Sequence, residues 1–201
     1  MTTKSRLTAV LAMAAVAGIG LATPSLAQST TTASSATASA PFCGIYWGSL
    51  PKVDSSPLAL GPVKDVRTGQ HACYDRMVID VHGPVGGYTV NYVEGTPATG
   101  NPNGLYARGG ANLSIFVNNV VVPVPGTHHS TAVDNPDEAT DVSAYRTFRQ
   151  VRELIYGPLG PYGPEGVQFA LGVRAHLPFR VFTLDGPGLD SRLVIDVAHK
   201  W

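Results

Sequence analysis

One hexapeptide occurs twice in the chain and says most about its fold. Arg-Met-Val-Ile-Asp-Val at residues 76–81 returns as Arg-Leu-Val-Ile-Asp-Val at residues 192–197, with five of the six positions identical. In both copies the apolar second, fourth and sixth positions alternate with the others, which is the two-residue period of a β-strand. Strand formation does not require the repeated Arg and Asp, so the match indicates an internal pseudo-repeat of two similar half-domains.

The two copies also predict how they pair. If the strands run antiparallel with Val78 opposite Val194, the Arg of each copy faces the Asp of the other. An acid and a base placed across neighbouring strands stabilise each other. We therefore predict a structural cross-strand network formed by Arg76, Asp80, Arg192 and Asp196.

Other short β-branched segments bounded by Gly, Pro, Asp or Asn follow the same pattern. They are residues 88–93, 113–117, 120–122, 167–173, 179–184 and 193–197. Glycines around Pro84 predict a turn that joins 76–81 and 88–93 as a hairpin. An apolar step of three predicts a short helix or turn over 141–146, followed by a strand over 147–156. The spacing predicts an all-β sandwich or barrel with long Gly/Pro-rich loops.

Composition agrees with many short strands and excludes several classes of protein. The 201 residues include 22 Gly and 16 Pro, which argues against a long helical bundle. Hydrophobic residues make up 44% of the chain, which is enough for a real core. The 14 basic and 14 acidic residues cancel, so neither nucleic acid nor an anionic membrane surface is an expected partner.

The N-terminus has the pattern of an export signal. Lys4 and Arg6 precede an apolar run over residues 7–22, and small residues at 25 and 27 form a cleavage site after Ala27. The run is shorter than the ~20 residues that span a bilayer, so no stable membrane span is expected in the mature chain. We predict a signal peptide over residues 1–27 and a secreted, extracellular protein.

The chain after the signal divides into a tail and one domain. Residues 28–41 are almost all Ser, Thr and Ala, a composition that buries nothing and is predicted to be disordered. Residues 42–201 are predicted to form a single domain, which contains both cysteines, Cys43 and Cys73. In an exported protein such a pair is more often bridged than free. The alternative is a catalytic thiol at Cys73, two residues after His71.

Two motifs resemble a known family of envelope domains. The strand at 179–185 followed by Ser-Arg-Leu-Val-Ile-Asp-Val at 191–197 resembles the signature of the AMIN domain. Residues 67–78 resemble the AMIN-like branch of exported bacterial proteins, which has a Gly-x-His-x-x-aromatic-Asp-Arg core at this place. The resemblance covers residues 63–199. It implies a β-sandwich of two small sheets, location in the cell envelope and peptidoglycan binding. The chain departs from the AMIN pattern in carrying no amidase or secretin domain.

Catalytic and metal motifs give weak matches. Ser49-Leu50-Pro51-Lys52 has the Ser-x-x-Lys spacing, but Pro51 would break the helix that must present both side chains on one face. The neighbours His128 and His129 would point apart on a strand and lack a metal-binding motif. We expect no catalytic residue, no metal site and no cofactor.

Binding is the better-supported class of function. Loop aromatics stack on sugar faces, and arginines pair with carboxylates. The candidates are Tyr106, Arg108, Arg146, Tyr162 and the motif residue His71. Each tyrosine could equally be a half-buried packing residue. His71 could hydrogen-bond Asp75, line a groove, or pack at the entry to the strand.

These observations leave three hypotheses. The first is an exported, non-catalytic module that binds peptidoglycan or another cell-wall component, with a cell-wall glycan or peptide as its partner. The second is a secreted interaction protein that recruits another envelope protein through a sheet edge or its loops. The third and least favoured is a small hydrolase.

Overall fold

The structure is a computed structural model that describes residues 41–94, 106–120, 133–154 and 166–201. The chain divides into two units, residues 1–38 and 39–201, and all of these residues belong to the second. The predicted signal peptide, almost all of the predicted tail, Tyr162 and the pair His128–His129 lie outside the described residues. No helix long and apolar enough to cross a membrane occurs in the described part of the chain.

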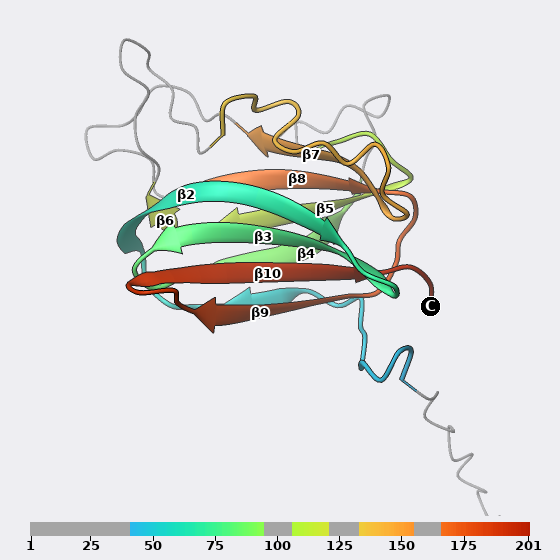
Figure 1. Cartoon of the computed structure of the whole chain (residues 1–201), viewed down its shortest axis with the longest axis horizontal. Coiled ribbons are helices and arrows are strands. Elements are labelled where there is room, and N and C mark those ends of the chain that lie inside the picture. Colours follow the sequence, from blue (N-terminus) through green and yellow to red (C-terminus); the bar gives the residue numbers. More distant parts are fainter. Residues whose placement is uncertain (1–40, 95–105, 121–132, 155–165) are drawn as a thin grey trace, which may run out of the picture. The chain divides into compact units, whose positions relative to one another are not determined.

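Ten strands occur among the described residues, none of which is helical. They are β1 (Lys52–Asp54), β2 (Ala59–Gln70), β3 (Tyr74–His82), β4 (Tyr88–Val93), β5 (Ala111–Val117), β6 (Asn119–Val120), β7 (Phe148–Leu154), β8 (Val167–Val173), β9 (Phe179–Asp185) and β10 (Asp190–Ala198). One sheet has the order β1-β4-β5-β8-β7 and the other β6-β2-β3-β10-β9. The predicted all-β fold with two small sheets is therefore confirmed (Figure 1).

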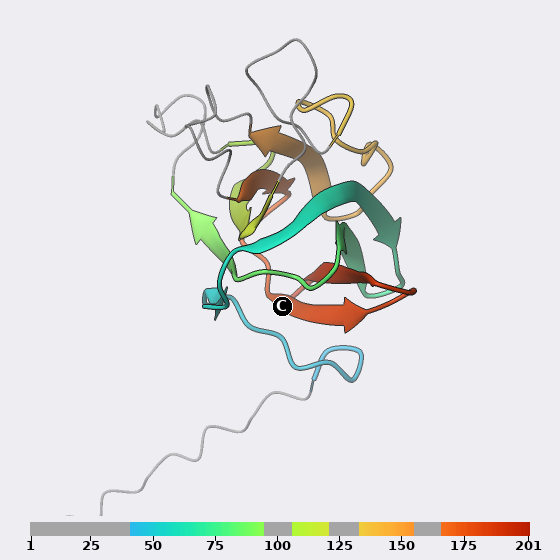
Figure 2. The ribbon, with the colours of Figure 1, turned by 90° about the vertical axis from the view of Figure 1, so that its left-hand side faces the viewer.

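The core lies between the two sheets and follows the predicted alternation. The inward side chains of β3 and β10 are fully buried: Met77, Ile79, Val81, Leu193, Ile195 and Val197. The facing sheet contributes equally buried side chains, which include Leu113, Ile115, Phe169 and Leu171. Figure 2 looks along the strands and shows the two sheets on either side of this core. The outward positions of β3 and β10 remain available for a site.

The predicted register of the repeated hexapeptides is confirmed. Strands β3 and β10 are antiparallel neighbours, and Val78 lies opposite Val194. Arg76 forms the predicted ion pair with Asp196, with Nε and Oδ1 2.6 Å apart.

The second predicted facing pair, Arg192 and Asp80, is confirmed in the register, but its two side chains do not form an ion pair. Arg192 lies opposite Asp80 in the register, but Asp80 accepts hydrogen bonds from Arg67 on β2 instead. Strand β3 has a neighbour on each side, so two arginines compete for one carboxylate. The side chain of Arg192 instead donates to the carbonyl of Asp185 on β9.

The predicted hairpin between 76–81 and 88–93 is wrong. Strand β3 belongs to one sheet and β4 to the other, so the segment between them crosses the sandwich. A Cβ on Gly86 would lie 2.0 Å from the carbonyl oxygen of Asn118, so this glycine permits a close crossing of two backbones. The Asn119 side chain holds the crossing, since it accepts from the Gly86 N–H and donates to the carbonyl of Gly61. Gly and Pro residues predict that the chain changes direction, but they do not predict which sheet the next strand joins.

Of the two alternatives for 141–146, the structure has the turn. The Tyr145 N–H donates to the carbonyl of Val142 at 3.0 Å, and Val142 is buried against the core. The predicted strand follows as β7, and residues 155 and 156 lie beyond the described segment. The three-residue apolar step therefore places Val142 and Phe148 in the core without a helix.

The hydroxyl of the partly buried Tyr92 makes the free energy of unfolding depend on pH in the alkaline range. It donates to the carbonyl of Leu177 at 2.6 Å and accepts from the Leu177 N–H at 3.0 Å. Burial raises the pKa of Tyr92 to about 12, from the ordinary value of 10.0 that the tyrosine has in the unfolded chain. Its contribution is therefore complete below pH 10 and is lost as the pH rises to about 12.

We expect the free energy of unfolding to fall by about 2 kcal/mol across that window through this residue. Urea denaturation at several pH values measures it. Tyr92→Phe lacks the ionisable group and is expected to show a smaller loss. Burial also raises the pKa of Tyr88, so some alkaline dependence remains in that variant. An identical pH profile for Tyr92→Phe and the parent would contradict the assignment.

Candidate functional site

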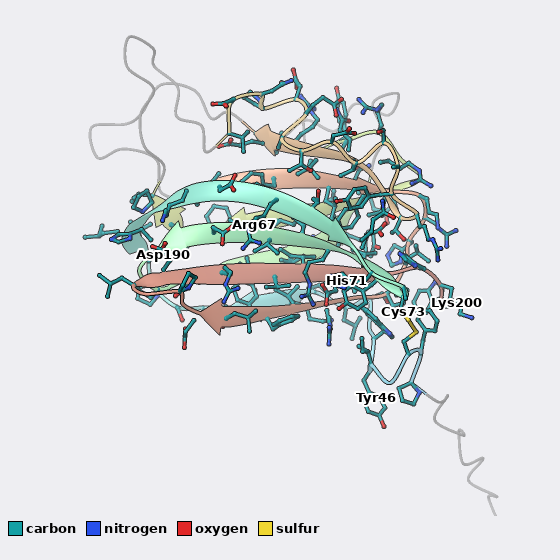
Figure 3. All side chains as sticks on the ribbon, viewed as in Figure 1. Tyr46, Arg67, His71, Cys73, Asp190 and Lys200 are labelled. Carbon is teal, nitrogen blue, oxygen red and sulfur yellow. A yellow bond between two sulfur atoms is a disulfide. The ribbon has the colours of Figure 1, made fainter. Side chains whose placement is uncertain are left out.

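The outer face of the β6-β2-β3-β10-β9 sheet carries a hollow of about 260 Å³. Its walls are side chains from β2, β3, β9 and β10 together with the turn after β2. They are Arg67, Thr68, Gly69, His71, Arg76, Val78, Leu184, Arg192 and Val194. We call this site the arginine groove. Figure 3 shows Arg67 and His71 on this face of the sheet.

The groove exists because one strand position has no side chain. Gly69 lies opposite Arg76 in the register of β2 and β3. A Cβ built on Gly69 meets no atom within 4 Å, so the space above the strand is open. Val78 and Val194 line the hollow beside it and are themselves almost fully buried. A β-branched or aromatic residue, the type that strands usually contain, would place its side chain in this space.

Asp196 holds two of the arginines beside the groove. Its side chain is fully buried and accepts from Nε and Nη2 of Arg76 at 2.6 and 2.9 Å. Arg180 on β9 approaches from the other side, with Nε and Nη2 2.8 and 2.7 Å from Oδ2 of Asp196. Hydrogen bonding to Asp196 raises the pKa of Arg76, so this guanidinium stays positively charged. One carboxylate therefore serves two guanidinium groups.

Arg67 and Arg192 complete the set, and they differ in how they are paired. Arg67 makes a two-point contact with Asp80 at 2.6 and 2.9 Å, and this contact raises the pKa of Arg67. Nε of Arg192 is buried without a hydrogen-bond partner among the described residues, and its Nη2 reaches the Asp185 carbonyl only at 3.3 Å. Three guanidinium groups, those of Arg67, Arg76 and Arg180, thus share two carboxylates, and Arg192 has no carboxylate partner among the described residues.

Aromatic rings continue the site beyond the groove. The guanidinium of Arg180 lies 5.6 Å from the ring centroid of Trp47, 5.5 Å from Tyr74 and 5.0 Å from Phe182. His71 stacks on Tyr74 with ring centroids 4.4 Å apart. Cations placed over ring faces are attracted by the ring quadrupole. These contacts keep the arginines extended along the sheet instead of free in solvent.

The motif acid Asp75 anchors the end of the sandwich. It is fully buried and accepts from the N–H groups of Thr147 and Phe148 and from Nε2 of His199, the last at 3.0 Å. The hydrogen bond considered between His71 and Asp75 is absent; Asp75 interacts with His199, and His71 stacks on Tyr74. His71 lines the groove, as the second of its three alternatives proposed.

The predicted loop residues lie apart from the groove. Arg108 forms an ion pair with Glu138, and the Tyr106 carbonyl accepts from Arg152 on β7, in the other sheet. Arg146 is exposed and follows Tyr145, whose hydroxyl donates to Thr68 of the groove at 3.0 Å. Ligand binding by Tyr106, Arg108 and Arg146 stays a prediction, as does that by Tyr162, which lies outside the described residues.

Arg180, Gly69 and Trp47 belong to the site but were not among the residues predicted to bind a ligand. Arg180 has a local signal, because it occupies the outward position of β9 that faces Asp196. Gly69 is the first residue of the Gly-x-His motif, but the motif does not predict a hollow. The space above Gly69 depends on side chains of the neighbouring strands. No local pattern around Trp47 relates it to Arg180.

Two groups of types that can support catalysis, His199 and Lys52, make structural contacts. Nε2 of His199 faces Asp75, and its Nδ1 faces the carbonyl of Ala72 at 3.2 Å. Lys52 lies on a strand, not a helix, and donates to the Leu50 carbonyl. No group of three or more His, Cys, Asp or Glu side chains that could hold a metal ion occurs among the described residues.

Comparison with known proteins gives one clear match. A family model described as "AMIN-like domain" matches residues 61–199, which include every strand from β3 to β10 and most of β2. A search of curated proteins finds no match to the chain. All residues of the arginine groove lie inside the matched range.

Proposed function

The chain belongs to the AMIN-like domain family and is thereby a cell-wall-associated module of the amidase-related group, and from this premise we propose that it binds peptidoglycan without cleaving it. The arginine groove is the binding site, and it takes carboxylates of the peptide stems. The protein acts outside the cytoplasm as a secreted module. The Cys43–Cys73 disulfide is consistent with that location.

The unpaired state of Arg192 is the observation that supports this proposal. A guanidinium binds a carboxylate through two parallel hydrogen bonds, and such charge-assisted bonds are stronger than neutral ones. Arg192 lines an open hollow and has no carboxylate partner among the described residues. Peptide stems of peptidoglycan carry free carboxylates, which supply the missing partner.

The zero formal charge of the chain makes this a local and not a global attraction. Ionic adsorption of a whole protein to an anionic polymer is screened by salt. Contacts in a partly enclosed groove are screened less. Binding to purified sacculi is therefore expected to survive moderate salt.

Two substitutions test the groove from opposite directions. Arg192→Ala removes the guanidinium that has no carboxylate partner among the described residues, and Gly69→Val places a side chain in the hollow, where a Cβ on residue 69 meets no atom within 4 Å. Each is expected to raise the Kd for sacculi about tenfold or more, because a charge-assisted hydrogen bond contributes roughly 1.5–3 kcal/mol. A β-branched residue suits a strand, so Gly69→Val is expected to fold at least as stably as the parent. Cosedimentation with purified sacculi measures the binding.

Lys64→Ala is the matched control. It removes one positive charge from β2, the strand that carries Gly69. Lys64 pairs with Asp190 and is not among the groove residues. Its binding is expected to equal that of the parent. Retention of the parent in the supernatant at low and moderate salt alike would refute peptidoglycan binding. Release of soluble muropeptides would refute the non-catalytic half of the proposal.

Recruitment of another envelope protein is the second candidate function. Strand β9 lies at the edge of its sheet and pairs with β10 along one side, and Thr183 to Asp185 on it are exposed. An open edge of this kind can accept a strand from a partner. Failure of the parent to sediment with purified sacculi would favour this alternative over the groove.

A further inference from the structure

A second hollow, of about 210 Å³, lies where the chain enters and leaves the domain. Its lining residues are Pro41, Phe42, Ile45, Tyr46, Trp47, Pro178 and Trp201. We propose that this aromatic hollow binds sugar rings of an N-acetylated glycan strand. The inference rests on the proposed function, because the same polymer would place its peptide carboxylates in the arginine groove.

The aromatic hollow is an addition to the family fold. The family model matches residues 61–199, and of the lining residues only Pro178 falls in that range. The segment before β1 and the last residue of the chain supply all of the aromatic rings. This chain therefore carries a surface that family membership by itself does not account for.

The rings are held in place before any ligand arrives. The disulfide ties Cys43 to Cys73 at the start of β3, with Cα atoms 6.4 Å apart. The Phe179 N–H donates to the carbonyl of Gly48 at 2.7 Å and fixes the other end of the segment. Figure 3 shows Tyr46 at the outer end of this segment, beyond the disulfide at Cys73.

Hydrogen bonds also fix the two indoles. Trp47 Nε1 donates to the Phe42 carbonyl at 2.9 Å, and Trp201 Nε1 donates to the His176 carbonyl at 3.1 Å. Because the polar N–H groups are already satisfied, the ring faces remain for apolar contacts. A site ordered in this way loses little conformational entropy on binding.

Exposure of these rings indicates a ligand and not a packing role. Tyr46 is 81% exposed and Trp201 is 71% exposed, although buried aromatics normally supply core packing. The apolar C–H face of a sugar ring covers an aromatic face, while its hydroxyl groups stay in water. A hollow smaller than the ~300–1,000 Å³ of drug-like pockets suits one unit of a polymer rather than a complete free ligand.

Continuity with the arginine groove identifies the polymer. Trp47 lines the aromatic hollow, and its ring lies 5.8 Å from Tyr74 and 5.6 Å from the Arg180 guanidinium. Tyr74 in turn lies 5.2 Å from the guanidinium of Arg76, a residue of the groove. A ligand that spans both sites must offer sugar faces and carboxylates together, as peptidoglycan does.

The test uses a ligand that contains sugar and no peptide. An oligomer of β-1,4-linked N-acetylglucosamine is titrated into the exported chain while the indole N–H signals of Trp47 and Trp201 are followed by NMR. Tyr46→Ala and Trp201→Ala are each expected to raise the Kd for the oligomer about tenfold, because each removes a stacking aromatic. Leu50→Ala is the matched control, since Leu50 is 76% exposed and is not a lining residue. It is expected to bind as the parent does.

The outcomes separate this inference from the proposed function. Arg192→Ala is expected to bind the oligomer normally while losing affinity for sacculi. If the parent binds sacculi through Arg192 but gives no indole shifts with the oligomer, the sugar site is refuted and the groove stands. If the oligomer binds through Tyr46 and Trp201 while sacculi binding ignores Arg192, the groove is refuted instead. Equal oligomer affinity in Tyr46→Ala, Trp201→Ala and the parent would also overturn the sugar site.

Discussion

Asp196→Ala is expected to lower the free energy of unfolding by about 3–5 kcal/mol, which is the cost of breaking a buried ion pair. The Asp196 side chain is fully buried and is shared by Arg76 and Arg180. Its removal leaves two guanidinium groups side by side without this carboxylate. The side chain of Arg76 is 23% exposed and that of Arg180 is 32% exposed. Urea denaturation followed by circular dichroism measures the change.

The repeated hexapeptide supplies the control for this experiment. Asp80 occupies the same position in the first copy, but it pairs with Arg67, whose side chain is 53% exposed. Exposed ion pairs contribute little, so Asp80→Ala is expected to cost about 1 kcal/mol or less. Equal losses in the two variants would contradict the view that burial, and not the motif itself, makes Asp196 important.

Loss of the disulfide is expected to lower the free energy of unfolding by about 3–4 kcal/mol, from the loop-closure entropy of the unfolded chain. The bridge closes a loop with a sequence separation of 30 residues, and the predicted pairing of Cys43 with Cys73 is confirmed. The double variant Cys43→Ser/Cys73→Ser removes it. Trp47 lies on the segment that the bridge clamps, so its fluorescence is expected to change as well.

Reducing agent provides the matching comparison. It is expected to destabilise the parent to the level of the double variant and to leave that variant unchanged. Reduction is also expected to weaken oligomer binding at the aromatic hollow, since Tyr46 and Trp47 lie on the clamped segment. A parent whose denaturation midpoint is the same with and without reductant would contradict the clamp.

The outcome for the candidate site shows where local reasoning succeeds. The motif residues Gly69, His71, Tyr74 and Arg76 were recognised from the sequence, and all four lie in or beside the arginine groove. Strand alternation places Arg76 and Asp196 on one face, and the hexapeptide repeat predicts their pairing. Long loops were preferred as binding sites on general grounds, whereas Arg108 on such a loop is engaged with Glu138.

The partner of a given side chain is harder to predict than its face. Asp80 has Arg192 on one neighbouring strand and Arg67 on the other, and it pairs with Arg67. Which arginine pairs with Asp80 depends on the length and direction of the side chains and on the position of β2. The sequence of the hexapeptide determines neither. The same limit applies to the glycines after β3, which were expected to close a hairpin and instead cross between sheets.

Some features follow from a local alternation, from a repeated motif or from there being one possible partner, and these could be predicted without the structure. These are the strands with their two-residue period, the register of the repeated hexapeptides and the pairing of the only two cysteines. Other features emerge only on folding: which sheet each strand joins, which arginine has no carboxylate partner among the described residues, and how Trp201 comes to line one hollow with Tyr46. The physical reason is range: alternation and register are set within a strand pair, whereas sheet membership and surface hollows depend on residues that only folding brings together.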